Sequence, residues 1–124
     1  MTTPDERMRA IRFGRETLSD LTTRTDVSVQ TRTVAGEILE RYPTHDDLVG
    51  FLETQRLVLP HEWADALRDA RKLLETVGLS RDLPEGAPFF ILATLRHFPE
   101  EGLLECVSRG PVALTWLAHE RDWP

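Results

Sequence analysis

Two stretches of the chain follow nearly the same pattern, 56 residues apart. Placing residues 4–52 over residues 60–108 without a gap gives ten identical positions, against roughly three expected from ordinary composition. The identical pairs are Pro4/Pro60, Glu6/Glu62, Ala10/Ala66, Arg12/Arg68, Arg15/Arg71, Leu18/Leu74, Asp26/Asp82, Leu39/Leu95, Pro43/Pro99 and Leu48/Leu104. A repeat of this length predicts two structural units, at residues 4–56 and 60–109, and a C-terminal extension at residues 110–124. We call two residues that lie 56 positions apart counterparts.

Two amphipathic helices that happen to be in phase are the alternative explanation of these matches. Such helices account for the matched apolar positions. They account less well for the matched prolines, for the counterparts Arg12 and Arg68, and for the counterparts Arg15 and Arg71. We therefore interpret the pattern as an internal duplication within a single globular domain, residues 1–124.

Each unit is predicted to consist of helices. The sequence TPDE at residues 3–6 is a capping box with proline at the first helical position, so a helix is expected to begin there. The apolar residues that follow recur at helical spacing in both units. They are Ala10, Ile11, Gly14, Leu18 and Leu21 in the first unit and Ala66, Leu67, Ala70, Leu74 and Val77 in the second. Asp26 and Asp82 are placed to cap a second helix in each unit.

The second helix of each unit is expected to end at an aromatic residue followed by proline. Pro43 follows Tyr42 and Pro99 follows Phe98, and the residue before a proline avoids helical geometry. The stretch PFFILATL before the second corner is apolar nearly all round, which predicts the most buried, central helix. After each corner a third, shorter helix is expected, and the segment at residues 110–119 has its own start signal. No stretch alternates as a strand does, so we predict an all-α domain of six or seven helices.

Charge and composition exclude several classes of protein. The chain has 15 basic and 21 acidic residues and a net charge of −6, which is a poor match to a phosphate backbone. No apolar run reaches the ~18 residues that a membrane helix needs, and the charged N-terminus lacks the apolar core of a signal peptide. The single cysteine, Cys106, rules out an internal disulfide. The cytoplasm is therefore the expected location.

No motif for catalysis or for metal binding is present. The four histidines do not form an HExxH or a related ligand pattern. Cys106 stands in the apolar stretch LLECV, where a buried, inert thiol is the default. Gly-rich phosphate loops are absent. We therefore expect no catalytic residue, no metal and no cofactor, and only a site assembled from residues far apart in the sequence would make the chain an enzyme.

Several residues are candidates for a structural or a binding role. Four arginines are expected to tie the first helix of each unit to the start of the second, at Asp26 and Asp82. The structural set is Arg12, Arg15, Asp26, Tyr42, Pro43, Arg68, Arg71, Asp82, Phe98 and Pro99. Phe13 lies across the helix from the apolar stripe and its counterpart is Asp69, so it is either an internal contact or an anchor for a partner. Further candidates for partner binding are Trp123 near the end of the chain and the acidic pairs Asp46, Asp47, Glu100 and Glu101, whereas Trp116 is expected in the core.

The opening sequence MTTPDERMRA, at residues 1–10, resembles a group of small uncharacterised proteobacterial proteins that begin with an MTxPDERxRA motif. These proteins also carry a corner of leucine, arginine, histidine, an aromatic residue and proline. That corner is matched by LRHFP at residues 95–99 and more loosely by LERYP at residues 39–43. The resemblance covers about the first 50 residues and, through the repeat, part of the second half. It implies a bacterial origin and a helical fold, and it transfers no catalytic residue.

The sequence as a whole favours a non-enzymatic protein that binds another protein. Acidic, compact proteins without chemistry of their own include inhibitors of the toxin-immunity and phage anti-defence types, which cover a basic surface of the target. One alternative is a nucleic-acid-associated regulator that uses the arginines of the first helix, a use that the interleaved acids make unlikely. The other alternative is a structural scaffold or homodimer that uses Phe13 and the C-terminal tryptophans.

Overall fold

The computed structural model describes residues 2–54, 58–79, 87–109 and 116–117. These residues form six α-helices and no strand, which confirms the predicted all-α class. The helices are α1 (Pro4–Thr23), α2 (Val29–Arg41), α3 (His45–Glu53), α4 (His61–Gly78), α5 (Ala87–Arg96) and α6 (Glu101–Arg109). Of the seventh helix expected at residues 110–119 only residues 116–117 are described, and these two are not helical; the predicted roles of Asp82 and Trp123 lie outside the described residues.

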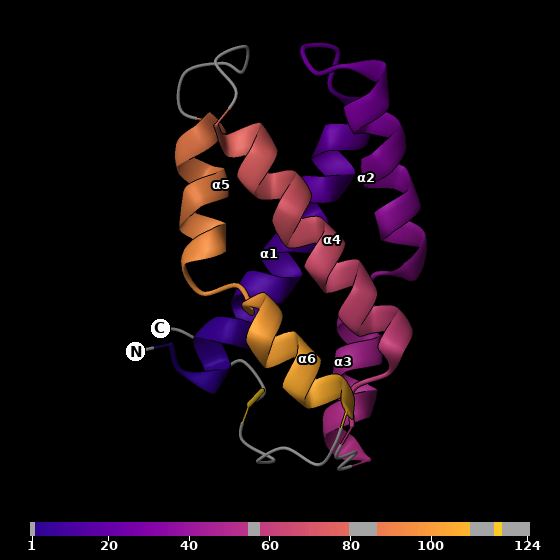
Figure 1. Cartoon of the computed structure of the whole chain (residues 1–124), viewed down its shortest axis with the longest axis vertical. Coiled ribbons are helices and arrows are strands. Elements are labelled where there is room, and N and C mark those ends of the chain that lie inside the picture. Colours follow the sequence, from indigo (N-terminus) through magenta and orange to yellow (C-terminus); the bar gives the residue numbers. More distant parts are fainter. Residues whose placement is uncertain (1, 55–57, 80–86, 110–115, 118–124) are drawn as a thin grey trace.

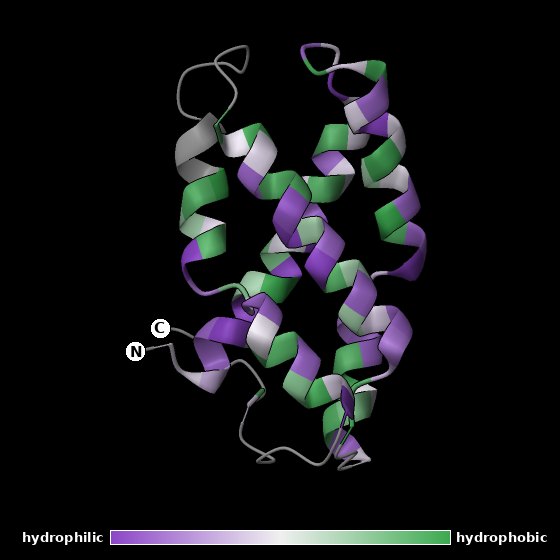
Figure 2. Ribbon diagram, in the orientation of Figure 1, coloured by the Kyte–Doolittle hydropathy of each residue, from purple (hydrophilic) through white to green (hydrophobic). Residues whose placement is uncertain are grey.

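Two long helices, α1 and α4, cross in the middle of the molecule (Figure 1). Helix α2 packs against both of them on one side, and α5 packs against both on the other side. The short helices α3 and α6 lie below, where α6 packs against α4. The long helices α1, α2 and α4 carry both apolar and polar residues along their length (Figure 2), as expected for helices that pack with one face around a shared core.

The helix starts follow the predicted capping chemistry, with one correction. The Thr3 and Glu6 side chains each accept a hydrogen bond from the other's backbone N–H, at 3.1 and 2.9 Å, and the bond from Thr3 lowers the pKa of Glu6. Thr44 and Asp47 form the same box at α3. The prediction that Asp26 caps the second helix is wrong. Ser28 is the N-cap of α2, and Asp26 binds the guanidinium of Arg24.

The core repeats from one unit to the other. Every residue that is buried between positions 4 and 52 has a buried counterpart. The pairs are Met8/Ala64, Ala10/Ala66, Ile11/Leu67, Gly14/Ala70, Leu18/Leu74, Leu21/Val77, Ala35/Ile91, Ile38/Thr94, Tyr42/Phe98, Pro43/Pro99, Leu48/Leu104 and Phe51/Val107. Burial of these side chains supplies the main stabilising free energy of the fold, because apolar area removed from water is worth about 25 cal/mol per Å².

The apolar stretch PFFILATL does not form the central helix, contrary to the prediction. It lies in α5, at one side of the molecule (Figure 1), where Leu92 is 54% exposed and Ala93 is also exposed. The central position belongs to α1 and α4, whose inward residues, such as Ile11 and Leu67, are fully buried. Part of the apolar surface of α5, at Leu92 and Ala93, is therefore exposed to solvent.

The two aromatic corners converge on the middle of α1. A Cβ atom placed on Gly14 would lie 2.7 Å from the Phe98 ring and 2.7 Å from the Tyr42 hydroxyl oxygen. That hydroxyl donates a hydrogen bond to the carbonyl of Ile11, and burial raises the Tyr42 pKa well above its usual value, so the group stays protonated. Helix α1 therefore reaches both corners only because position 14 has no side chain.

Matching arginines hold the two corners. Arg15 donates to the carbonyl of Tyr42 at 3.0 Å, and its counterpart Arg71 donates to the carbonyl of Phe98 at 2.9 Å. The prediction that these arginines reach the start of the second helix is wrong: they bind its end. Arg68 does not tie the helices together either, because it pairs with Asp65 of its own helix at 2.8 Å.

The contact at Gly14 predicts that Gly14→Ala destabilises the protein. The new methyl group displaces two buried aromatic side chains, which lowers the free energy of unfolding by about 1–3 kcal/mol. This loss exceeds the gain of ~0.5–1 kcal/mol that replacing glycine by alanine brings in a helix interior. Chemical denaturation of both proteins measures the difference. Gly36→Ala is the control, since a Cβ atom at that position of α2 meets nothing within 4 Å. If both substitutions raise the stability, the corners do not press on Gly14.

The corner arginines predict a second difference in stability. Arg15→Met keeps most of the side-chain volume but removes a charged donor to a backbone carbonyl, so a loss of about 1–3 kcal/mol is expected. Arg68→Met removes only an exposed ion pair and is expected to cost under about 1 kcal/mol. A double-mutant cycle between Arg15 and Asp26 is expected to show no coupling, because these residues bind different partners. Equal losses for the two single variants would argue against the corner contact.

Candidate functional site

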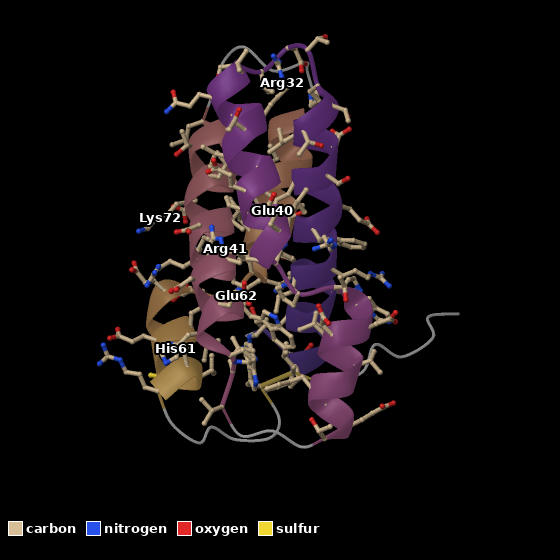
Figure 3. The ribbon with its side chains drawn as sticks, turned by 90° about the vertical axis from the view of Figure 1, so that its right-hand side faces the viewer. Arg32, Glu40, Arg41, His61, Glu62 and Lys72 are labelled. Carbon is tan, nitrogen blue, oxygen red and sulfur yellow. The ribbon has the colours of Figure 1, made fainter. Side chains whose placement is uncertain are left out.

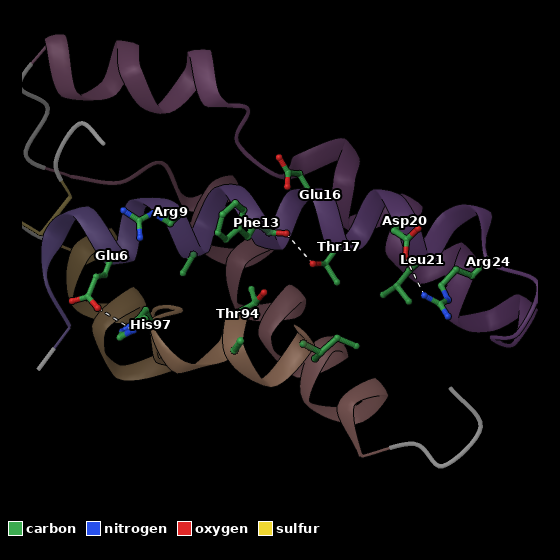
Figure 4. A pocket seen from close by; sticks show the side chains of 13 residues that line it. Glu6, Arg9, Phe13, Glu16, Thr17, Asp20, Leu21, Arg24, Thr94 and His97 are labelled. Atoms are coloured by element: carbon green, nitrogen blue, oxygen red, sulfur yellow. Dashed lines mark hydrogen bonds and ion pairs between the residues drawn. The ribbon is translucent and has the colours of Figure 1, made fainter. Parts of the chain in front are cut away.

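A groove of about 670 Å³ lies between α1 and α5 (Figure 4). It is lined from α1 and its C-cap by Glu6, Arg9, Ala10, Phe13, Glu16, Thr17, Asp20, Leu21 and Arg24, and from α5 by Ile91, Ala93, Thr94 and His97. Its size falls within the range of ligand and peptide sites. Since α1 rises 1.5 Å per residue, the lined stretch from Glu6 to Arg24 is about 27 Å long.

Polar side chains close the two ends of the groove (Figure 4). At one end His97 Nε2 lies 3.0 Å from Glu6 Oε2, and His97 Nδ1 lies 3.1 Å from the Thr2 hydroxyl. At the other end Arg24 pairs with Asp20 at 3.2 Å. The middle of the groove is more apolar, so an elongated amphipathic occupant fits it better than a compact polar one.

Phe13 forms one wall of the groove. Its ring is 39% exposed, and the guanidinium of Arg12 lies 5.3 Å from the ring centroid, which is a cation–π distance. Arg12 therefore helps to orient Phe13. The stacked arginine leaves part of the ring available to an occupant of the groove.

A smaller hollow of about 340 Å³ lies in the matching place between α2 and α4. It is lined by Val34, Glu37, Ile38, Arg41, Asp69, Lys72, Leu73 and Thr76. Apart from Val34, whose counterpart side chain is not described, each of these residues has a counterpart that lines the groove. Arg41 bridges to Asp69 across this hollow at 3.1 Å, and Figure 3 shows Arg41 and Lys72 on this side. In the groove, His97 stands at the position of Arg41 and Phe13 at the position of Asp69, so this ion pair has no equivalent there.

Side chains also differ beneath the two openings. Ile38 is 1% exposed and Leu73 packs against the core in the α2/α4 hollow. Their counterparts in the groove are Thr94 and Thr17. Each threonine has a smaller apolar part than the residue that it matches, so at these two described positions the groove has less aliphatic volume than the other side.

The other predicted binding residues do not gather at the groove. Asp46 and Asp47 begin α3, Glu101 begins α6 and Glu100 directly precedes it. Figure 3 shows α3 and α6 on opposite sides of the lower part of the molecule, so the two acidic pairs do not combine into one face. Trp116 is buried, as predicted, and its carbonyl accepts a hydrogen bond from Arg7.

Cys106 and the described histidines carry side chains that can act as nucleophiles or as metal ligands. Cys106 is exposed, which corrects its expected burial, because LLECV turns its cysteine outward on α6. Within the described part of the chain, no group of three His, Cys, Asp or Glu side chains is placed to hold a metal ion. The same residues contain no helix with the length and apolar character needed to cross a bilayer.

Comparison with known proteins identifies no relative: no protein-family model, curated protein or solved structure matches the chain.

Sequence reasoning identified Phe13 and missed Thr17, Thr94 and His97. A signal for them was present in the repeat. Thr17 stands opposite Leu73 in the alignment, and Thr94 stands opposite Ile38. A polar residue in one copy at an aliphatic position of the other marks a place where the two units pack differently, but only the structure shows that both places line one groove.

The small side chains at positions 17 and 94 predict that larger aliphatic residues there would occupy part of the groove. Thr17→Leu combined with Thr94→Ile is expected to raise the free energy of unfolding by about 1–2 kcal/mol, because each adds buried aliphatic carbon worth about 0.8 kcal/mol per CH₂ group. The reciprocal variant Ile38→Thr is expected to cost about 2 kcal/mol or more. Thermal unfolding measures both. If the Thr17→Leu/Thr94→Ile variant, which we call the filled variant, is helical yet less stable than the wild type, the groove has no room for the added carbon atoms.

Proposed function

We propose that the chain is a protein-binding module and that the groove between α1 and α5 is its docking surface. The observation that carries the proposal is the combination of an apolar middle, polar ends and the exposed Phe13 ring in one elongated groove. Interfaces are centred on aromatic anchors with an apolar core and a polar rim. The groove has the same three parts: Phe13 as an aromatic residue, an apolar middle and polar ends.

The mechanism proposed is occlusion of a partner's surface, as in inhibitors of the toxin-immunity or phage anti-defence type. The net charge of −6 would attract a partner with a basic surface and speed their encounter. Contacts of Phe13 and its apolar neighbours would then hold the complex. Association is therefore expected to slow as salt is added, while dissociation changes less.

The arginines of α1 support this function over nucleic-acid binding. Arg7 donates to the carbonyl of Trp116, Arg15 donates to that of Tyr42, and Arg24 is paired with Asp20 and Asp26. These guanidinium groups are engaged within the fold. A nucleic-acid surface needs basic groups that face outward together, whereas Arg7 and Arg15 of α1 bind backbone carbonyls of other segments.

We also infer that the two units, α1–α3 and α4–α6, arose by duplication. Three observations support this history: the shared pattern of buried positions, the matching bonds of Arg15 and Arg71 to the two corners, and the matching places of the groove and the α2/α4 hollow. After such a duplication, one opening would have kept its ion pair and the other would have lost it. The groove would then be the part of the repeat in which the copies diverged for function.

Affinity capture with matched variants tests the docking surface. We expect Phe13→Asp to lose a protein partner that the wild type retains from a lysate of its native host, because the aspartate places a charge in the apolar part of the interface. Leu79→Asp is the control, since it introduces the same charge at a residue of α4's C-terminal end that is 81% exposed. A partner retained equally by all three proteins would show that the groove is not the docking surface.

A further inference from the structure

The α2/α4 hollow shows what the groove lacks. In the hollow, Ile38 and Leu73 supply aliphatic packing beneath the Arg41–Asp69 ion pair. In the groove, Thr94 and Thr17 stand at those places, and His97 turns toward Glu6. The same backbone arrangement is thus completed internally on one side of the molecule and left incomplete on the other.

The side chains that complete the hollow indicate the chemistry of an occupant. At positions 17 and 94 the groove has threonine where the hollow has branched aliphatic side chains, and leucine, isoleucine or valine side chains of a partner would supply that volume. On a helix, residues three and four positions apart form one row, and such a row would follow the groove along α1. Helices that dock in grooves use this spacing of anchors.

The charges of the groove favour a basic occupant. Its lining holds three carboxylates, on Glu6, Glu16 and Asp20, against two guanidinium groups, on Arg9 and Arg24. Arg24 is shared, because it also binds Asp26 at 2.7 Å. In the α2/α4 hollow Lys72 stands at the position of Glu16 and Thr76 at that of Asp20, so the acidic character is a property of the groove side alone.

We propose that the occupant is an amphipathic helix of a partner protein, which inserts aliphatic side chains between Thr17 and Thr94 and places lysine or arginine beside Glu16 and Asp20. This inference rests on the proposed docking function of the groove. It adds the form of the bound segment, the side chains that enter and the sign of the flanking charge. Phe13 then covers the inserted side chains from the edge of the groove.

A designed peptide tests this chemistry directly. The probe is a synthetic helical peptide of about 18 residues, long enough to follow α1 from Glu6 to Arg24 at 1.5 Å per residue. It has leucine along one face and lysine on both flanks. Titration into the isotope-labelled protein is expected to shift the backbone amide signals of α1 and α5. Serine in place of leucine should abolish the shifts, and glutamate in place of lysine should weaken binding at least tenfold.

Variants of the protein complete the test. Thr17→Leu/Thr94→Ile fills the groove and is expected to weaken peptide binding at least tenfold, whereas Leu79→Asp binds as the wild type does. Shifts elsewhere, no binding at about 1 mM peptide, or equal binding to the filled variant would overturn the inference. So would a dimer that Phe13→Asp dissociates, since the occupant would then be a second copy of the chain.

The two proposals fail in different ways. If the filled variant binds the leucine peptide as the wild type does, while Phe13→Asp still loses the host partner, the aliphatic row is wrong and the docking surface stands. If Phe13→Asp retains the host partner, the docking surface itself is wrong. Loss of the host partner in both Phe13→Asp and the filled variant, together with peptide binding at α1 and α5, supports both proposals.

Discussion

The approach of two aromatic corners to a single glycine is the constraint on which the rest of the fold depends. Tyr42 and Phe98 end their helices and meet α1 at Gly14, and this contact fixes where α2 and α5 stand on either side of α1. Arg15 and Arg71 hold the same corners through backbone carbonyls. Because buried side chains pack at nearly crystalline density, a helix placed in this way has few alternative positions.

The side chains on α1 and α5 shape the groove. Helix α2 packs against α4, and α5 packs against α1; an opening lies between the helices of each pair. An ion pair and aliphatic packing close the α2/α4 side, whereas Thr17, Thr94 and the outward Phe13 leave the α1/α5 side open. A binding role is expected at positions where residues 4–52 differ from their counterparts in residues 60–108, since the buried positions that they share form the core.

Much of the fold could be predicted from local signals. The capping boxes at Thr3 and Thr44, the stop at Pro43 and the inward stripes of α1 and α4 all follow from chemistry within a few residues. The errors have a common cause. Asp26, the apolar stretch of α5 and Cys106 were each assigned from residue type alone, but their surroundings depend on which neighbours the tertiary structure brings near.

The sequence by itself determined the helical class, the repeated sequence pattern and the inward stripes of α1 and α4, because hydrophobic periodicity and capping act over short distances along the chain. It also singled out Phe13 as a position where the copies differ. Only the tertiary structure decided that Arg15 reaches the end of α2 instead of Asp26, and that Phe13, Thr17 and Thr94 line one groove. These facts depend on the packing of α5 against α1, between residues about 80 positions apart, and periodicity along the chain carries no information about such contacts.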